Sequence, residues 1–217
     1  MQTDDTANPG MLSVLDGEAL WTAKAGPAGR ACADCHADAK VTMKGVAARY
    51  PAWSEARRSP IDLAGQIDLC RTERQGALPW QPESADRLAI TAFVAHQSRG
   101  LPIAPPAGAG MEAARTRGRA LFTARMGQLD LSCAACHDDN WGKRLAGAPI
   151  PQAHPVGYPI YRLEWQSVGS LQRRLRNCMS GVRAEAYPYG APELVDLEAF
   201  LMERAAGLAI ETPAVRP

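Results

Sequence analysis

The chain has 217 residues, the length of one large domain or two small ones. Hydrophobic residues make up 46% and charged residues 22% of it, which excludes a disordered or collagen-like chain. Lys plus Arg (24) nearly balances Asp plus Glu (23), so we expect no binding to nucleic acid or to an anionic membrane. Charges, Gly or Pro interrupt every stretch of the ~18 residues that a membrane span needs, so we expect no span.

The N-terminal segment and the first predicted helix come first along the chain. The first ten residues, MQTDDTANPG, have neither a basic nor an apolar segment, so they are not an export signal. Residues 17–24 (GEALWTAK) carry apolar residues at helical spacing, and we expect them to open a helix.

A C-x-x-C-H motif follows, and the chain contains it twice. The first copy holds Cys32, Cys35 and His36, and the second holds Cys133, Cys136 and His137. This spacing is that of c-type haem attachment, in which both thiols bond to the porphyrin and the histidine binds the iron. A zinc site would need its ligands within one small module, whereas these pairs lie 101 residues apart. The sequence therefore predicts two covalently attached haem c groups.

The haem motifs also predict a compartment. Haem attachment of this kind takes place outside the cytoplasm, so we expect an exported protein of the bacterial periplasm, here in its mature form. Free cysteines tend to oxidise there, which makes the two remaining cysteines informative.

These two cysteines, Cys70 (IDLCRTE) and Cys178 (LRNCMSG), each follow a Tyr-Pro pair by 20 residues. An electron-carrying cytochrome c has its methionine ligand in the matching loop, before the last helix. We interpret both as thiolate axial ligands that give His/Cys coordination. A Cys70–Cys178 disulfide and two buried structural thiols are the alternatives. Rival ligands are Met43, Met126, Met179, His96 and His154.

A second helix and a joint end the first half of the chain. Residues 83–99 (ESADRLAITAFVAHQSR) predict a helix that Gly100 closes. The uncharged stretch 101–110 (LPIAPPAGAG) predicts a joint between domains 1–104 and 105–217.

The second half then repeats the first. Residues 118–125 (GRALFTAR) match 17–24 at five of eight positions, and each block begins fifteen residues before its haem motif. A Pro-Glu-x-x-Asp sequence follows each lone cysteine, from Pro82 and from Pro192, and residues 193–206 predict the last helix. The duplication predicts a mainly α fold of two class I cytochrome-c-like domains, each with a covalent haem.

The halves differ in charge near the lone cysteines. Arg174 stands four residues before Cys178, where Gln66 stands before Cys70, and residues four apart share a helix face. Further arginines lie nearby in sequence, namely Arg162, Arg173, Arg176 and Arg183. A basic pocket suits a small anionic substrate, because guanidinium groups bind oxyanions in bidentate fashion. A solvated arginine-rich helix face is the alternative.

Long stretches of this chain resemble a known family. They are MKGVAARYP (43–51), AFVAHQSRGLPI (92–103), GQLDLSCAACHDDNWGKRLAG (127–147), HPVGYPIYRLEWQ (154–166), GSLQRRLRNCMSGVRAE (169–185) and PAVRP (213–217). The family is SoxA, the dihaem cytochrome subunit of the SoxAX complex of bacterial sulfur oxidation. Some members lack the N-terminal haem motif, and this chain retains it.

The resemblance implies an activity, L-cysteine S-thiosulfotransferase. SoxAX-type proteins join thiosulfate oxidatively to a cysteine thiol of the sulfur carrier SoxYZ, and two electrons leave through c-type haem. The resemblance implies a heterodimer with SoxX, itself a c-type cytochrome. It also implies that the C-terminal haem is the active one, that Cys178 can carry an extra sulfur, and that Arg174 lines the substrate site.

Other functions remain open. A plain dihaem electron-transfer cytochrome is one, and a thiosulfate dehydrogenase that forms tetrathionate is another. A dihaem peroxidase needs an open iron site, which two thiolate ligands do not offer.

Electron paramagnetic resonance of the oxidised protein tests the ligand assignment. We expect only low-spin haem with His/thiolate coordination, because the repeat places Cys70 and Cys178 alike. A His/Met signal from protein with both cysteines intact would overturn the assignment.

Overall fold

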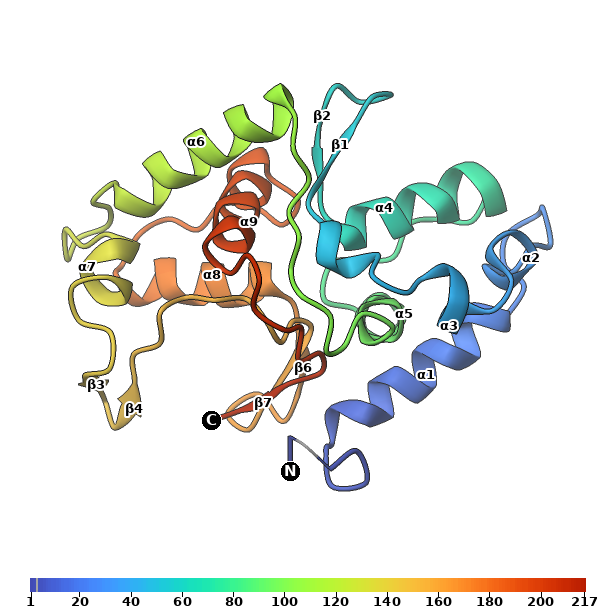
Figure 1. Cartoon of the computed structure of the whole chain (residues 1–217), viewed down its shortest axis with the longest axis horizontal. Coiled ribbons are helices and arrows are strands. Elements are labelled where there is room, and N and C mark those ends of the chain that lie inside the picture. Colours follow the sequence, from blue (N-terminus) through green and yellow to red (C-terminus); the bar gives the residue numbers. More distant parts are fainter. Residues whose placement is uncertain (3) are drawn as a thin grey trace.

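Two similar halves lie side by side in the computed structural model, which describes residues 1–2 and 4–217 (Figure 1). The first half contains α1 (Gly10–Thr22), α2 (Ala33–His36), α3 (Ala39–Thr42), the 3₁₀ turn η1 (Ala47–Arg49), β1 (Ala52–Ser54), β2 (Ser59–Ile61), α4 (Leu63–Cys70), the π-helical turn η2 (Arg71–Gln75) and α5 (Ala85–His96). The second contains α6 (Ala109–Thr123), α7 (Cys133–His137), β3 (Arg144–Leu145), β4 (Ala148–Pro149), β5 (Ile160–Arg162), β6 (Ser167–Gly169), α8 (Leu171–Gly181), α9 (Pro192–Arg204) and β7 (Val215–Arg216). The predicted mainly α fold of two cytochrome-c-like units is confirmed.

In each half the first and last helices cross at a glycine. A Cβ atom on Gly17 would lie 2.2 Å from the carbonyl oxygen of Ala89, and one on Gly118 would lie 2.0 Å from that of Asp196. No side chain fits such a gap, so both crossings require glycine. These glycines begin the two repeated blocks that the sequence shows.

The predicted start of both helices is wrong. α1 begins at Gly10 and α6 at Ala109, so residues 17–24 and 118–125 cover the ends of these helices and not their beginnings. The buried side chains of Val14 and Met111 lie upstream of the crossing glycines and extend each buried face toward the N-terminus.

The register of α5 and α9 differs from the equivalence that the Pro-Glu-x-x-Asp repeat suggests. The glycine contacts pair Ala89 of α5 with Asp196 of α9, whereas the Pro-Glu-x-x-Asp repeat would pair Asp86 with Asp196. Asp86 is exposed, while Asp196 is buried and forms a two-point ion pair with Arg117, at 2.7 and 2.9 Å. The two Pro-Glu-x-x-Asp sequences are therefore not equivalent. The helix predicted over 193–206 is α9.

Part of the predicted joint, residues 101–110, forms backbone hydrogen bonds with a segment that follows α9. α5 ends at His96, three residues before the predicted Arg99, and Gly100 has a left-handed φ of 79°. Its N–H donates to Ile210 O (2.8 Å), and the Ile210 N–H donates to Leu101 O (3.0 Å). Segment 100–103 (GLPI) thus pairs with 207–210 (GLAI), a similar sequence that follows α9.

Four groups of buried side chains lie among the described residues, and the smallest consists of Met111, Ala114 and Ala199. The first half contains Val14, Trp21, Ala39, Ile90, Ala92, Phe93 and Val94, and the second contains Phe122, Met179, Leu194, Leu197, Phe200 and Leu201. A third group joins the halves, with Ala48, Ile103, Ala205 and Ile210. The boundary between residues 104 and 105 stays a prediction, although each half has its own core.

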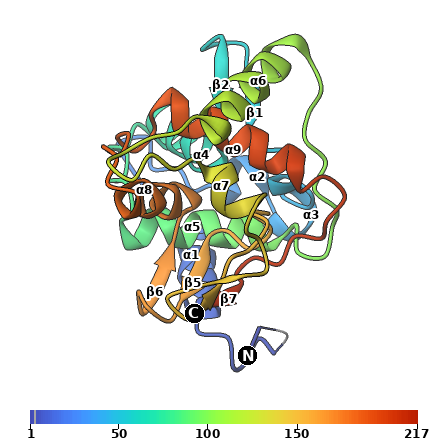
Figure 2. The same ribbon diagram turned by 90° about the vertical axis from the view of Figure 1, so that its left-hand side faces the viewer.

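Short strands complete the fold. β1 and β2 form an antiparallel hairpin that rises between the halves, and β3 and β4 form a second one at the edge of the molecule (Figure 1). β5 pairs antiparallel with β6 and parallel with β7. The two termini lie at the same end (Figure 2), where Gln2 Nε2 donates to Glu211 Oε2 (2.8 Å). Within residues 1–2 and 4–217, no helix has the length and apolar character to cross a bilayer.

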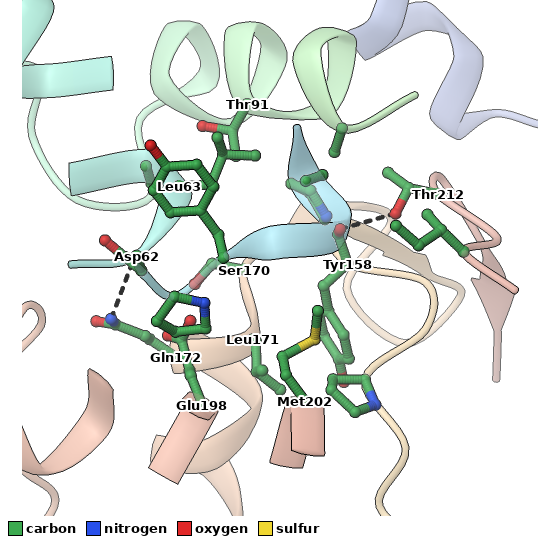
Figure 3. Close-up of a pocket in the computed structure, with 18 of the residues that line it drawn as sticks. Asp62, Leu63, Thr91, Tyr158, Ser170, Leu171, Gln172, Glu198, Met202 and Thr212 are labelled. Carbon is green, nitrogen blue, oxygen red and sulfur yellow. Dashed lines mark hydrogen bonds between the residues drawn. The ribbon is translucent and has the colours of Figure 1, made fainter. Parts of the chain in front are cut away.

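A small cavity of about 100 Å³ lies between the halves and contains a cluster of polar groups (Figure 3). Asp62 is the N-cap of α4, where its Oδ1 accepts from Gly65 N (2.8 Å). Gln172 in the first turn of α8 donates from Nε2 to Asp62 Oδ2 (3.2 Å), and its amide also faces Glu198 of α9. Glu198 is buried, with 8% of its surface exposed.

These carboxyls hold protons more tightly than free ones. Burial raises the pKa of Glu198 well above its ordinary value, and the charge of Asp62 raises it further. Burial also raises the pKa of Asp62, although Arg87 acts in the opposite direction. Arg87 is itself paired with Asp68, Nε to Oδ2 at 2.7 Å, so it cannot neutralise two further carboxylates. Proton uptake by one carboxyl of the pair therefore relieves both the burial of charge and the repulsion between the two groups.

Replacing Glu198 by Gln should change how stability depends on pH. A raised folded-state pKa means that the folded protein binds more protons than the unfolded chain, so wild-type stability falls as pH rises through that pKa. The stability lost over the whole titration amounts to about 1.4 kcal/mol for each unit of pKa shift. We expect the variant to lose less stability than wild type as the pH rises above the ordinary pKa of a glutamate, as measured by urea unfolding of the holoprotein.

The exposed Glu18 on α1 offers the same substitution outside the cavity. Glu18→Gln should keep the wild-type pH dependence, and a Glu198→Gln profile parallel to wild type would contradict the interpretation.

Candidate functional site

The first half contains a cavity of about 530 Å³ between α2 and α4. It brings together the predicted attachment residues Cys32 and Cys35, the predicted iron ligand His36, and the lone Cys70. Trp21 from α1 packs against His36, with ring centroids 5.8 Å apart. The apolar part of the wall is formed by Trp21, Met43, Val46, Leu63, Ile67, Ile90 and Val94.

The composition of this cavity fits a haem. Its apolar walls suit the macrocycle, and four arginines suit two propionate carboxylates, namely Arg30, Arg49, Arg71 and Arg74. No Asp or Glu stands among the described residues that line it. Arg71 is held in place by its Nε, which donates to Leu78 O (2.7 Å), and by stacking on Trp80 at 3.8 Å.

The second attachment motif forms α7, which Ser132 caps by accepting a hydrogen bond from Ala135 N (3.1 Å). His137 Nδ1 lies 2.7 Å from Pro151 O. Because a carbonyl oxygen can only accept, Nδ1 carries the proton and Nε2 is left free to bind a metal. Phe122 lies 6.5 Å from His137 and takes the position that Trp21 has in the first half.

Both lone cysteines lie on helices, which corrects their prediction as loop residues. Cys70 ends α4, and Cys178 lies in α8. Cys178 is half-buried and close to Cys136, and burial raises the pKa of its thiol. The guanidinium groups of Arg174 and Arg162 act in the opposite direction and so favour the thiolate. The structure thus brings together Cys178, Arg174 and the second haem motif.

Arg162 and Glu164 complete this charged group. Arg162 Nε lies 2.9 Å from Glu164 Oε1, and the Arg162 side chain is 13% exposed. Arg174 Nη1 lies 3.9 Å from the same oxygen, and the Arg174 side chain is 34% exposed. Arg162 is thus the closer partner of Glu164, whereas Arg174 is loosely paired and more accessible.

Tyr158 is a site residue that the sequence interpretation missed. Burial raises its pKa to about 12, although Arg174 acts in the opposite direction, so its hydroxyl remains protonated. It belongs to the Tyr-Pro pair that precedes Cys178, and the equivalent Tyr50 lies near Cys70. The repeated Tyr-Pro pair was the available signal.

The remaining arginines that the sequence suggests for the basic pocket make other contacts. Arg173 stacks on Trp165 at 4.2 Å, and Arg176 stacks on Tyr189 at 4.4 Å. Arg183 is exposed. Only Arg162 and Arg174, of the five arginines that the sequence suggests, act on the Cys178 thiol.

The first half lacks this charged group. β1 and β5 both follow a Tyr-Pro pair, which places Ser54 at the position of Arg162 and Ala56 at that of Glu164. Gln66 takes the place of Arg174, and its Nε2 lies 3.6 Å from Cys70 Sγ. The same frame therefore carries neutral residues at the three positions that Arg162, Glu164 and Arg174 occupy in the second half, although other arginines line the first cavity.

The methionines and histidines that compete with Cys70 and Cys178 as predicted iron ligands lie in different parts of the structure. Met43 lines the first cavity, Met179 is buried in the second core and Met126 packs against that core. His96 lies near Arg99 and Asp5, and His154 lies near Arg204. The six cysteines form no disulfide in the part of the chain that the structure describes.

Two such units, each with an attachment motif and an aromatic ring against its histidine, define a c-type cytochrome. The model of the SoxA/TsdA cytochrome c domain family matches residues 16–103 and 117–210, once in each half. The chain belongs to this family, on its SoxA branch.

Similar proteins support this assignment. The L-cysteine S-thiosulfotransferase subunit SoxA of Pseudaminobacter salicylatoxidans is 39% identical over 99% of this chain and 76% of the relative. That of Rhodovulum sulfidophilum is 34% identical over 100% of this chain and 75% of the relative. The crystal structure of SoxXA from P. pantotrophus superposes with a TM-score of 0.95 at 30% identity, covering 100% of this chain and 81% of the other.

Proposed function

We propose that this chain is the SoxA-type subunit of an L-cysteine S-thiosulfotransferase that joins thiosulfate to a cysteine thiol of a SoxYZ-type carrier protein. The observation that carries the proposal is the pair Arg162 and Arg174 beside the Cys178 thiol. The overall reaction removes two electrons and one proton: a carrier thiol and thiosulfate give a cysteine S-thiosulfonate. The reaction is thus a two-electron oxidation of the two sulfur compounds that forms one S–S bond.

We propose two covalent haem c groups. Cys32 and Cys35 attach the first and Cys133 and Cys136 the second. His36 with Cys70, and His137 with Cys178, would bind the iron of each group. Haem, when bound, accepts the electrons one at a time. The free Nε2 of His137 and the apolar cavity beside His36 support these assignments.

Binding of the anion is the first task of the site. Thiosulfate is a dianion and repels a thiolate, so guanidinium groups are needed to bring the two together. Arg162 is fixed by Glu164 and remains in place, while Arg174 is free to leave its distant contact with Glu164 and turn to the anion. The Tyr158 hydroxyl adds a neutral donor on the same side.

Cys178 then serves as the sulfur relay. Its sulfur bonds to the sulfane sulfur of thiosulfate as two electrons leave. The carrier thiolate attacks the same sulfane sulfur and displaces the Cys178 thiolate. The second step is a thiol exchange and needs no further oxidant.

A SoxX-type c-type cytochrome is the proposed partner in a heterodimer, as in the SoxXA complex from P. pantotrophus. Exposed apolar side chains near the second haem motif offer a surface for it, since Trp141 is 56%, Leu145 66% and Leu129 45% exposed. We place the complex in the periplasm, where c-type haem attachment and thiosulfate oxidation occur together in this family.

Replacing Arg174 by Ala should slow the conjugation of thiosulfate to a carrier cysteine peptide about tenfold to hundredfold, the value of a hydrogen bond to a charged group. The haem absorption spectrum should not change. Arg173→Ala is the matched control, because that neighbouring side chain stacks on Trp165. If the Arg174 variant and wild type have equal activity across a thiosulfate titration, Arg174 is a solvated residue of the helix face and does not bind the substrate.

The product of the assay distinguishes the other candidate functions. Tetrathionate as the only product would favour a thiosulfate dehydrogenase. The absence of any thiosulfate-dependent product would favour a plain electron carrier.

The two lone cysteines should not be interchangeable. Cys178→Met should keep a six-coordinate haem, because Met is a competent ligand, yet abolish conjugation, because a thioether cannot exchange with a thiol. Cys70→Met should raise the potential of its haem and leave much of the activity. The assay compares the two variants side by side. Loss of conjugation in the Cys70 variant alone would move the active site to the other half.

A further inference from the structure

The lone cysteine of the first half has its own hydrogen-bond donor. Gln66 lies one helical turn before Cys70 on α4, and its Nε2 is 3.6 Å from Cys70 Sγ. Both residues line the cavity of about 530 Å³ that contains Cys32, Cys35 and His36. Gln66 is half-buried, so the contact is partly shielded from water.

The contact between Gln66 and Cys70 differs from the contacts of Arg174, the equivalent residue in the second half. Arg174 on α8 is charged, is 34% exposed and lies 3.9 Å from Glu164, so it is available to an anion from solution. Gln66 is neutral and donates to the sulfur itself. Ser54 and Ala56 replace the rest of the charged group, so the arginines that line this cavity, among them Arg49 and Arg71, come from other positions than Arg162 and Arg174 do in the second half.

A donor of this kind affects the electron density on sulfur. A thiolate ligand stabilises ferric over ferrous iron by donating electron density, and a hydrogen bond to the sulfur reduces that donation. An amide does so without adding a charge and without attracting an anionic substrate.

We propose that Gln66 is a positioning residue that raises the reduction potential of the N-terminal haem through the Cys70 sulfur, which suits that haem to electron relay. The inference rests on the proposed function in one respect, namely that Cys70 is an axial ligand. It assigns a role to the half of the molecule that lacks the arginine pair.

A redox titration of the holoprotein, followed by electron paramagnetic resonance, tests the inference with Gln66→Leu. Leucine fills a similar volume and cannot donate. We expect the equilibrium constant for reduction of the first haem to fall about tenfold, which is about 59 mV for a one-electron couple. The second haem should keep its potential.

Gln75 provides the matched control. It lines the same cavity, and its amide lies 3.8 Å from the sulfur of Cys32, an attachment residue, and 3.1 Å from Arg30 O. Gln75→Leu should move the potential much less, because that sulfur does not bind iron. Gln66→Arg restores a donor and should recover or exceed the wild-type potential.

Two results would overturn the inference, and they can be told apart. An unshifted potential in Gln66→Leu, with the His/thiolate signal of the first haem intact, rejects the role of Gln66 alone. A first haem without any thiolate signal in wild-type protein rejects the ligand assignment of Cys70, and the inference with it.

Discussion

The crossing of the first and last helices of each half fixes the rest of that half. At Gly17 and Gly118 the helix backbones meet directly, with room for a hydrogen atom and nothing larger. One turn later on the same helices stand Trp21 and Phe122, which pack against the histidines of the two attachment motifs. The glycine contact therefore positions the aromatic ring, and the ring positions the histidine, before any cofactor is considered.

The surroundings of the lone cysteine differ between the halves because a few side chains change on this shared frame. Arg162, Glu164 and Arg174 surround the second lone cysteine, and neutral residues replace all three at the first. A duplicated frame allows such divergence, since the backbone of each half is stabilised by its own core. The second half carries two guanidinium groups that act on its sulfur, while the first half has a neutral amide donor beside its own.

The sequence predicted those features that depend on short spacing. Both haem motifs, the two lone cysteines and the position of Arg174 one turn from Cys178 were found in this way. The helix starts were wrong because the crossing glycines looked like beginnings, although the buried face continues upstream. The false equivalence of the Pro-Glu-x-x-Asp sequences was a chance match that only the register of the glycine contacts exposes.

Contacts between distant segments were predicted less well. The sequence suggested Arg162 as one of several arginines, but its action on Cys178 depends on the tertiary structure and not on spacing along the chain. The cluster of Asp62, Gln172 and Glu198 joins three elements from both halves, and no periodicity within one of them indicates it. Burial of two carboxyls is costly, so a sequence interpretation places such residues at the surface.

That cluster links the two sulfur sites mechanically. Asp62 caps the helix that ends at Cys70, and Gln172 lies in the first turn of the helix that carries Cys178. Their 3.2 Å hydrogen bond ties the beginnings of both helices together across the interface. Gln172 also accepts a hydrogen bond from Gly190 N (2.8 Å), in the loop before α9, so the orientation of the Gln172 amide is fixed at both its nitrogen and its oxygen.

The bond between Gln172 and Asp62 resists movement of the two helices. A shift of either helix along its axis would break it and leave the Asp62 carboxyl without this donor, which costs more than the bond itself contributes. The two cysteines are thereby held at a set separation.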